Sequence, residues 1–295
     1  RSKKNNYREI SFCLGQKKDV EEVVKDLSTL GFNIIHISEK TSDNSIEGRS
    51  FTTHIFRVKC LSTALYLLFR SLGVPEGNKT NQQYTVPKWI INAERAIKKE
   101  FLSGYLGGDG PRVTIRVVTR KHKNPYNSLN INDIEFRKRL DIADSGINFA
   151  EGISELLREF GVGISRIFYE IDPYVRKDKT QTVIIHISIK HNFTNGFILS
   201  QKIGYAYCFQ KQLISMYAGE FIREIIKKRE SWIDLHNKVV SLSERGHSYK
   251  EVSDILKIDQ LLAYQWVIKR NKPTIKNHYL KFDQWLEESR EGLPE

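Results

Sequence analysis

The sequence predicts a mixed α+β fold, with two related halves followed by a small all-helical part. Helical and strand-like apolar periods alternate as far as Glu230, and the order helix, strand, strand, helix occurs twice. The glycines that end these helices keep a nearly constant offset, because the separation between Gly31 and Gly161 differs by a single position from that between Gly73 and Gly204. Beyond that point only helical patterns remain. We therefore expect three parts, at residues 1–92, 93–230 and 231–295.

Composition narrows the class of protein. The chain has 295 residues, of which 40% are hydrophobic and 28% charged, as in globular proteins. Its net charge of +12 indicates a polyanionic partner, and nucleic acid is the first candidate. The three cysteines form no CxxC pair, which favours a reducing, intracellular compartment: the cytoplasm, or the nucleus of a eukaryote. No apolar stretch approaches the length of a membrane span.

The first half reads as helix, two strands and helix. Apolar residues of Asp19–Phe32 follow the helical period, and Gly31 supplies a stop signal. Strand-like runs follow at residues 32–38 and 51–60, and a second helix at 61–73. The second half repeats this plan with a helix at 148–162, strands at 165–171 and 182–190, and a helix at 193–204.

The second half also has an opening helix, at residues 93–108, and a strand after it. Subtracting the separation between equivalent glycines of the two halves from position 109 puts the counterpart of Asp109 upstream of Arg1. We therefore expect that the first half lacks its opening helix in this sequence.

Three glycines lie in the last turns of that opening helix, at Gly104, Gly107 and Gly108. Each glycine inside a helix costs about 1 kcal/mol relative to alanine. Gly104 and Gly108 are four residues apart and share one face, so we expect a second helix to pack closely there. Asp109 would then meet an acid of the partner helix, and paired carboxylates are good ligands for Mg²⁺.

The segment "LSGYLGGDG", Leu102–Gly110, resembles the LAGLIDADG motif of homing endonucleases. The stretches "SLGVPEGNKTNQQYTVPKWI" and "IGYAYCFQKQ" resemble parts of the endonuclease region of inteins, so the resemblance covers about residues 5–230. The chain departs from the motif at Gly107, which replaces the first acid, and it has no first copy of the motif.

The resemblance implies two pseudo-symmetric αββαββα halves whose sheets straddle double-stranded DNA, in a monomer rather than a dimer. It implies a Mg²⁺-dependent double-strand break by phosphodiester hydrolysis at a long asymmetric site, with no small-molecule substrate. By position in the motif, Asp109 and the backbone of Gly108 would bind metal. Lys79 and Lys211, one from each half, would polarise the attacking water and neutralise charge at the scissile phosphates.

Residues for DNA contact are expected on the polar faces of strands, because side chains alternate along a strand. Alternation and charge select the following residues: Arg57 and Lys59 in the first half; Arg112, Thr114 and Arg116 with the loop residues Arg120, Lys121 and Lys123; and Thr182, His186, Ser188 and Lys190.

The C-terminal part is predicted to hold two short helices, Tyr249–Leu256 and residues 260–269, joined by a three-residue turn. This spacing resembles a helix-turn-helix, although a helical hairpin that packs on the main body is the alternative. The expected core is Val252, Ile255, Leu256, Ile258, Leu262, Trp266 and Val267. The candidates for DNA contact are Gln260, Tyr264, Gln265 and Lys269.

A competing interpretation is a catalytically degenerate DNA-binding module, or an RNA-binding intron maturase of the same fold. The missing first motif discriminates between these classes, because Asp109 alone cannot hold two metals symmetrically. The missing acid would come from an upstream segment or from dimerisation through the Gly104 face. We favour the upstream segment, because the chain already holds two copies of everything else.

Overall fold

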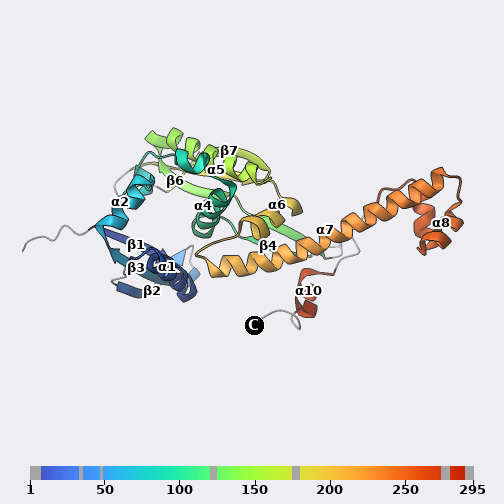
Figure 1. Cartoon of the computed structure of the whole chain (residues 1–295), viewed down its shortest axis with the longest axis horizontal. Helices are drawn as coiled ribbons and strands as arrows, with labels where there is room; N and C mark the ends of the chain where they lie inside the picture. The colour runs from blue at the N-terminus through green and yellow to red at the C-terminus, as the bar shows by residue number, and fades with distance from the viewer. Residues whose placement is uncertain are drawn as a thin grey trace, which may run out of the picture. The chain divides into compact units, whose positions relative to one another are not determined.

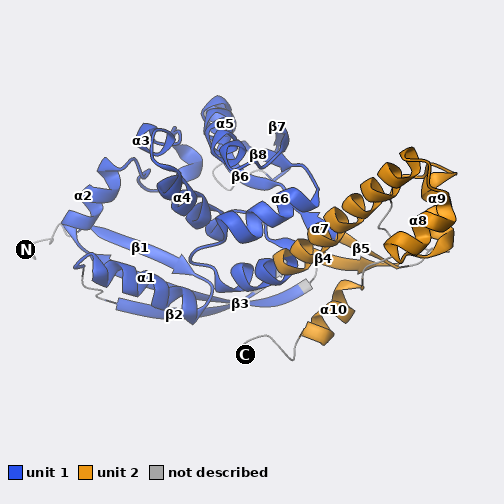
Figure 2. Cartoon of the chain, turned by 45° about the vertical axis from the view of Figure 1, so that its right-hand side comes forward, with its two compact units in different colours: residues 1–114, 129–218 blue, residues 115–128, 219–295 orange. Residues whose placement is uncertain are grey.

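A computed structural model describes residues 8–32, 36–46, 49–119, 125–174, 180–273 and 280–289. The chain divides into two compact units (Figure 2): unit 1 holds residues 1–114 and 129–218, and unit 2 holds residues 115–128 and 219–295. Helices and small antiparallel sheets are mixed along the chain, so the predicted α+β class is confirmed. The predicted boundaries at 92/93 and 230/231 stay a prediction.

The first repeat in unit 1 contains β1 (Glu9–Leu14), α1 (Lys17–Thr29), β2 (His36–Ile46), β3 (Arg49–Leu61) and α2 (Thr63–Ser71). Its three strands are antiparallel in the order β1-β3-β2. Buried Val23, Leu27, Cys60 and Leu65 form its core, so the helices cover one face of this sheet.

The second repeat contains β6 (Ile134–Arg139), α5 (Ala143–Glu159), β7 (Ile164–Ile171), β8 (Thr182–Ile189) and α6 (Phe193–Phe197), which continues into η3 (Ile198–Ile203). Its strands are antiparallel in the order β6-β8-β7. Both repeats, the first blue and the second mainly green in Figure 1, therefore have the same succession of elements. In both, the last strand lies in the middle of the sheet.

The helix stops used as landmarks in the sequence occupy matching places. Gly31 and Gly161 follow α1 and α5 with φ of 78° and 89°, a region that favours glycine. The N–H of Gly31 donates to the carbonyl of Ser28, and the N–H of Gly161 donates to the carbonyl of Arg158. Equivalent helix ends explain why the offset between the two halves is visible in the sequence.

Between the repeats lie η1 (Lys79–Asn81), α3 (Lys88–Ile91) and α4 (Arg95–Gly108), the helix with the three glycines. Lys98 of α4 is largely buried, and its Nζ donates to both carboxylate oxygens of Glu159 at 2.8 and 2.7 Å. This ion pair ties α4 to the end of α5.

The predicted strand after α4 is β4 (Val113–Val118), which pairs with β5 (Tyr126–Ile131), and β6 follows after a short break. Neither β5 nor β6 was predicted from the sequence. The segment that forms β5 and β6, "YNSLNINDIEFRKR", is rich in asparagine, aspartate and charged residues, which are depleted in strands. Pairing of β6 with β8 offsets this low propensity.

The last helices are α7 (Phe209–Glu244), α8 (Tyr249–Leu256), α9 (Gln260–Val267) and α10 (Phe282–Ser289). The helices predicted from residues 249 and 260 are confirmed, although α9 ends two residues early. Ser248 and Glu251 form a capping box at the start of α8, and Asp259 accepts a hydrogen bond from the N–H of Leu262 at the start of α9.

The core of this helical region holds Val239, Val252 and Trp266, with Leu256, Ile258, Leu262 and Val267 packed around them. Ile255 is 51% exposed, so its predicted place in the core is wrong. The face of α8 turned to the core holds Val252, Ser253 and Leu256, and Ile255 lies at the edge of this face, beyond Val252. Within the described ranges no helix is both long and apolar enough to cross a membrane.

Candidate nucleic-acid interface

The end of α4 brings two of the predicted residues together. Asp109 follows the helix and is exposed. The Nζ of Lys211 donates to the carbonyl oxygens of Leu106, Gly107, Gly108 and Gly110 at 3.2, 2.9, 2.9 and 2.8 Å. Burial lowers the pKa of Lys211, while the nearby Asp109 carboxylate opposes this shift. Lys211 is thus a cation bound at the negative end of α4.

Gly107 is explained by a close approach of the backbone. A Cβ at this position would overlap the carbonyl oxygen of Ala206, which belongs to the segment between η3 and α7. The N–H of Ala206 donates to the carbonyl and the Oγ of Ser103, at 3.1 and 3.0 Å. The close neighbour of Gly107 is therefore a connecting segment.

The other two glycines are less crowded. A Cβ at Gly104 would meet only the ring of Tyr207, at 4.0 Å, and a Cβ at Gly108 would meet nothing within 4 Å. The helix interface proposed for Gly104, Gly107 and Gly108 stays a prediction.

Lys138 was missed by the sequence analysis. Its side chain is completely buried, and Nζ donates to the carbonyl oxygens of Lys79 and Gln82 at 2.8 and 2.6 Å. The ammonium also lies 3.4 Å from the ring centroid of Tyr84. Burial and the charge of Lys79 lower the pKa of Lys138 to about 8. Lys79 itself is exposed, so Lys138 holds the backbone that carries it.

An aromatic cluster links this lysine to the end of α4. The Phe149 ring is within 5.0 Å of Tyr84 and 5.8 Å of Tyr105, measured between centroids. Burial raises the pKa of both tyrosines, and the charge of Asp109 adds to the shift. The buried Tyr105 hydroxyl has no hydrogen-bond partner among the described residues. Asp109, Tyr84 and Tyr105 thus share one electrostatic environment.

The donors at this end of α4 do not complete a magnesium site. Mg²⁺ needs about six oxygen ligands in octahedral geometry. Asp109 offers one carboxylate, but the carbonyl of Gly108 already accepts from Lys211. Among the described residues no group of three or more His, Cys, Asp or Glu side chains could hold a metal ion. These residues alone therefore do not fit the metal centre that the resemblance implies.

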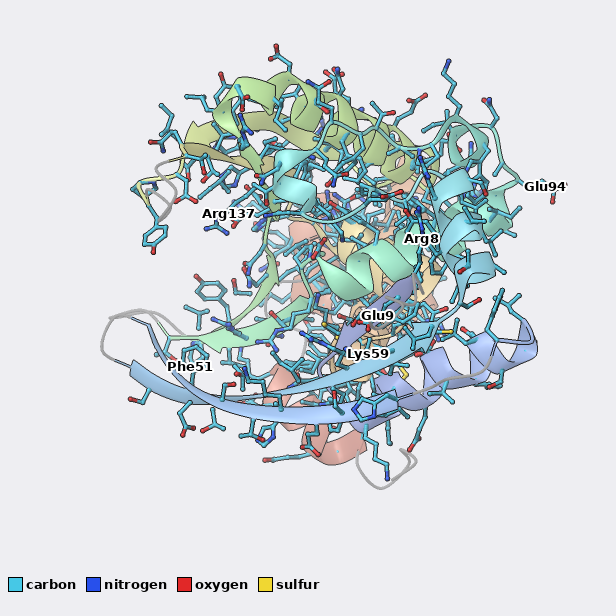
Figure 3. All side chains as sticks on the ribbon, turned by 90° about the vertical axis from the view of Figure 1, so that its left-hand side faces the viewer. Arg8, Glu9, Phe51, Lys59, Glu94 and Arg137 are labelled. Carbon is cyan, nitrogen blue, oxygen red and sulfur yellow. The ribbon has the colours of Figure 1, made fainter. Side chains whose placement is uncertain are left out.

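The open face of the first sheet carries the residues expected from alternation. Val58 and Cys60 of β3 are fully buried, while Arg57 is exposed and Lys59 half-buried on the other face. Lys59 pairs with Glu9 of β1, with 3.2 Å between Nζ and Oε2 (Figure 3). Phe51, six residues before Arg57, is on the same face and 40% exposed.

The middle strand of the second sheet differs from expectation. Thr182, His186 and Ser188 are only 1%, 8% and 9% exposed, so their predicted exposure is wrong. Because β8 lies between β6 and β7, side chains of both neighbours cover it. His186 stacks on the Phe168 ring at 4.6 Å, and Ser188 donates to Asp133 at 2.8 Å. Their role in DNA contact stays a prediction.

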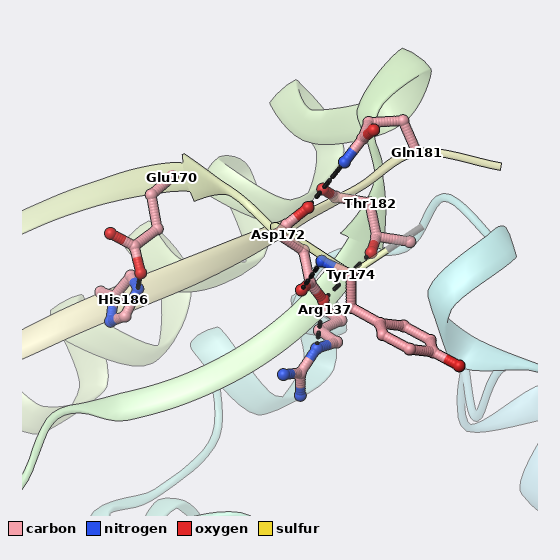
Figure 4. A network of polar contacts seen from close by, with 7 residues as sticks. All are labelled: Arg137, Glu170, Asp172, Tyr174, Gln181, Thr182 and His186. Carbon is pink, nitrogen blue, oxygen red and sulfur yellow. Dashed lines mark hydrogen bonds and ion pairs between the residues drawn. The ribbon is translucent and has the colours of Figure 1, made fainter. Parts of the chain in front are cut away.

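The exposed charges of this face come from β6 and β7 instead. They include Glu135, Arg137, Arg166 and Glu170, which the sequence analysis did not select. His186 lies 3.5 Å from Glu135 and 3.4 Å from Glu170, and Figure 4 shows the second contact beside the polar network of Asp172. A carboxylate-rich row thus crosses this face. Lys190 is exposed just beyond the end of β8.

The remaining predicted contacts are distributed over other elements. Arg112, just before β4, and Arg116 are exposed, and Thr114 between them is half-buried. These three residues alternate with buried Val113 and Ile115, as predicted. Arg120, Lys121 and Lys123 lie outside the described residues. On and after α9, Gln260 and Lys269 are exposed, whereas Tyr264 and Gln265 are half-buried. Tyr264 packs edge-on against Tyr249, and the Lys269 ammonium lies 5.9 Å from its ring centroid.

Comparisons with known proteins find stretches that are similar to this chain within several longer proteins. No family model matches the chain. The chain is 27% identical over 281 residues to the replication factor C small subunit of Methanocaldococcus jannaschii, covering 92% of the chain and 14% of that protein. It is 26% identical over 283 residues to the tRNA-splicing ligase RtcB of Pyrococcus furiosus, covering 93% of the chain and 27% of that protein. It is 30% identical over 213 residues to the DNA-directed RNA polymerase subunit Rpo1N of M. jannaschii, covering 70% of the chain and 15% of that protein.

The chain therefore spans little more than a quarter of these relatives at most. Among solved structures, a variant of I-DmoI in complex with its target DNA and in the presence of Mn is similar with a TM-score of 0.31 and 11% identity. That match covers 63% of this chain and 76% of the other. A TM-score of this size does not establish a shared fold.

Proposed function

We propose that this chain acts on double-stranded DNA as a homing endonuclease of the LAGLIDADG type, derived from an intein and dependent on Mg²⁺. The observation that carries the proposal is the repeated unit of strand, helix, two strands and helix, with strand orders β1-β3-β2 and β6-β8-β7. Each repeat has one sheet face free of its own helices, and the two faces carry Arg57 and Arg137. Two faces of this kind suit a long duplex site, with each face contacting a different stretch of base pairs.

The relatives support an inserted element. A replication factor subunit, a tRNA-splicing ligase and an RNA polymerase subunit are named for different activities, yet each matches this chain over a small share of its own length. A stretch common to such different proteins is better explained by an element carried within them than by their own activities. The proposal therefore assigns none of those three activities to this chain.

In the proposal, Asp109 is one carboxylate of the catalytic centre, and Lys211 holds the end of α4 that carries it. Lys79 would bring a second cation, on a segment held by Lys138. The metal would supply charge neutralisation at phosphate when bound. Because the described residues do not complete its site, a further carboxylate has to come from outside them.

The test uses the chain with duplex DNA that carries its coding locus without the insertion, in the presence of Mg²⁺. We expect a discrete double-strand cut by the wild type. Asp109→Ala should abolish the cut but retain binding, because Asp109 is exposed and lies after the end of α4. Cutting by both proteins at equal rates would exclude Asp109 from the centre.

The second candidate is a DNA-binding module without nuclease activity, or an RNA-binding maturase of the same fold. The observation that favours it is the Lys211 ammonium, which already binds the carbonyl of Gly108. Tight, salt-dependent binding of the same duplex without a cut would select the DNA-binding module. Preference for intron RNA over that duplex would select the maturase.

A further inference from the structure

Arg137 on β6 is an exposed arginine with a buried partner. Its side chain is 55% exposed, whereas that of Asp172 is 7% exposed. The Nε of Arg137 donates to Oδ2 of Asp172 at 2.7 Å (Figure 4). A contact through Nε alone uses neither terminal nitrogen of the guanidinium, and among the described residues neither of them donates a hydrogen bond. The guanidinium is therefore oriented, with its fork available.

Asp172 is itself held firmly. Its Oδ1 accepts from the N–H of Tyr174 at 3.0 Å, and its Oδ2 accepts from the hydroxyl of Thr182 at 3.3 Å. Its backbone carbonyl accepts from Nε2 of Gln181 at 2.7 Å. The hydrogen bond from Arg137, followed by those from Tyr174 and Thr182, lowers the pKa of Asp172, so the carboxylate is charged at neutral pH. The arrangement restricts the rotamers of Arg137 before any ligand arrives.

Arg139, two residues along the same strand, provides the contrast. It faces the same side of the sheet, but its Nε and Nη2 donate to the two carboxylate oxygens of Asp141 at 2.9 and 2.6 Å. This bidentate pair occupies the Nε–Nη2 edge of the guanidinium and so engages one of its two terminal nitrogens. Of these two arginines, Arg137 is the one whose orientation is set without using its terminal nitrogens.

The charges around Arg137 distinguish base recognition from phosphate binding. In the register of the sheet, Arg137 and Glu170 flank Ile184, while Glu135 and Phe168 flank His186. Glu135 and Glu170 are exposed, and carboxylates repel a phosphate backbone. In the major groove, however, an arginine fork matches O6 and N7 of guanine, and a carboxylate accepts from N4 of cytosine. A face of mixed charge therefore suits base edges better than phosphates.

We propose that Arg137 reads a guanine in the major groove, with Asp172 as its positioning residue. The inference rests on the proposed binding of duplex DNA, but not on cleavage. Thr182, predicted from the sequence to contact DNA, then acts indirectly by hydrogen bonding to Asp172.

The test begins with selection of duplexes from a random library by the wild-type chain, followed by binding titrations. For the selected duplex, we expect one G·C pair whose replacement by A·T weakens wild-type binding about 5- to 150-fold. Arg137→Ala should lose this discrimination at that pair alone. Arg139→Ala is the matched control and should keep it, because Nη2, one of the two terminal nitrogens of Arg139, is already bound to Asp141.

Asp172→Asn provides the second variant. The amide keeps the size of the side chain but replaces one acceptor oxygen by a donor, so we expect a lower melting temperature, and binding is measured well below it. Affinity for the duplex with the A·T replacement should be unchanged, with reduced discrimination at the same G·C pair. A purely structural role would instead weaken binding to all duplexes together.

The outcomes separate the inference from the proposed function. Failure of the wild type to bind any duplex would overturn both. Selection of a specific duplex by the wild type, with the same preference in Arg137→Ala, would overturn the inference and leave the proposed function standing. A uniform loss of affinity in Arg137→Ala, with a smaller salt dependence, would make Arg137 a phosphate contact and would also overturn it.

Discussion

The Nζ of Lys211 lies 2.9 Å from the carbonyl oxygen of Gly108, the residue immediately before Asp109. The position that the LAGLIDADG resemblance assigns to a metal ligand thus has an ammonium bound to it. The two residues are far apart in sequence, but η3 and the start of α7 return the chain to the end of α4. A lysine here stabilises the helix end whether or not metal binds.

Lys211→Met should lower the free energy of unfolding. Four carbonyl oxygens accept from this ammonium, and a single hydrogen bond to a charged group contributes about 1.5–3 kcal/mol, so we expect a loss of at least that order. Urea unfolding followed by circular dichroism measures the change. Lys99→Met is the control, because the Lys99 side chain is 44% exposed and should change stability by less than about 0.5 kcal/mol. Equal effects of both substitutions would contradict the role of Lys211.

Gly107→Ala and Gly108→Ala should have opposite effects. A methyl group at Gly107 meets the backbone carbonyl of Ala206, so we expect a loss of about 1–3 kcal/mol. Gly108 has open space around it, and alanine there should be neutral or stabilising by up to about 1 kcal/mol. Thermal unfolding of the two variants gives the comparison. A destabilising Gly108→Ala would show that a further element packs on this face, as the helix-interface prediction requires.

The helices and the strand patterns could be predicted from the sequence because they depend on local periodicity. The helical period identified α1 and α5, and helical patterns separated by a three-residue turn identified α8 and α9. The constant offset of the terminal glycines reflected equivalent helix ends.

The exposure of the site residues could not be predicted in the same way. Alternation assigned Thr182, His186 and Ser188 to one face, but only the strand order β6-β8-β7 shows that both neighbours cover them. Arg137 and Lys138 were missed because β6 itself has a sequence of low strand propensity. The role of each of these lysine and arginine side chains depends on partners that are distant in sequence, such as Asp172 and Gln82.

Lys138 should make stability depend on pH at alkaline values. Its pKa is lowered from 10.5 to about 8, so between these values the unfolded chain binds more protons than the folded one. The free energy of unfolding of the wild type, relative to Lys138→Met, should therefore rise as pH increases from about 8 to 10.5, by at most about 1.4 kcal/mol per pH unit. Urea unfolding at pH 7, 8.5 and 9.5 tests this. A difference that stays constant over the range would show that the lysine keeps its ordinary pKa.

Lys257→Gly should stabilise the C-terminal helices. Lys257 ends α8 in the left-handed conformation, with φ of 50°, which costs a non-glycine residue about 1 kcal/mol. Thermal unfolding followed by tryptophan fluorescence should show a higher melting temperature for this variant. Lys250→Gly, inside the first turn of α8, is the matched control and should lower it. A fall in both variants would mean that Lys257 makes a stabilising contact through its side chain.

Arg57→Ala should weaken binding to duplex DNA through loss of a phosphate contact. Arg57 is exposed on the open face of β3, whereas the charge of Lys59 beside it is paired with Glu9. Each phosphate contact contributes about 0.9 to the slope of log K against log salt, so the slope for a mixed-sequence duplex should fall by about that amount. Thr52→Ala is the control, since Thr52 lies on the opposite face and donates to Asp43. An unchanged slope in Arg57→Ala would place the duplex away from this face, because an exposed arginine in a phosphate-binding surface cannot be removed without releasing fewer counterions.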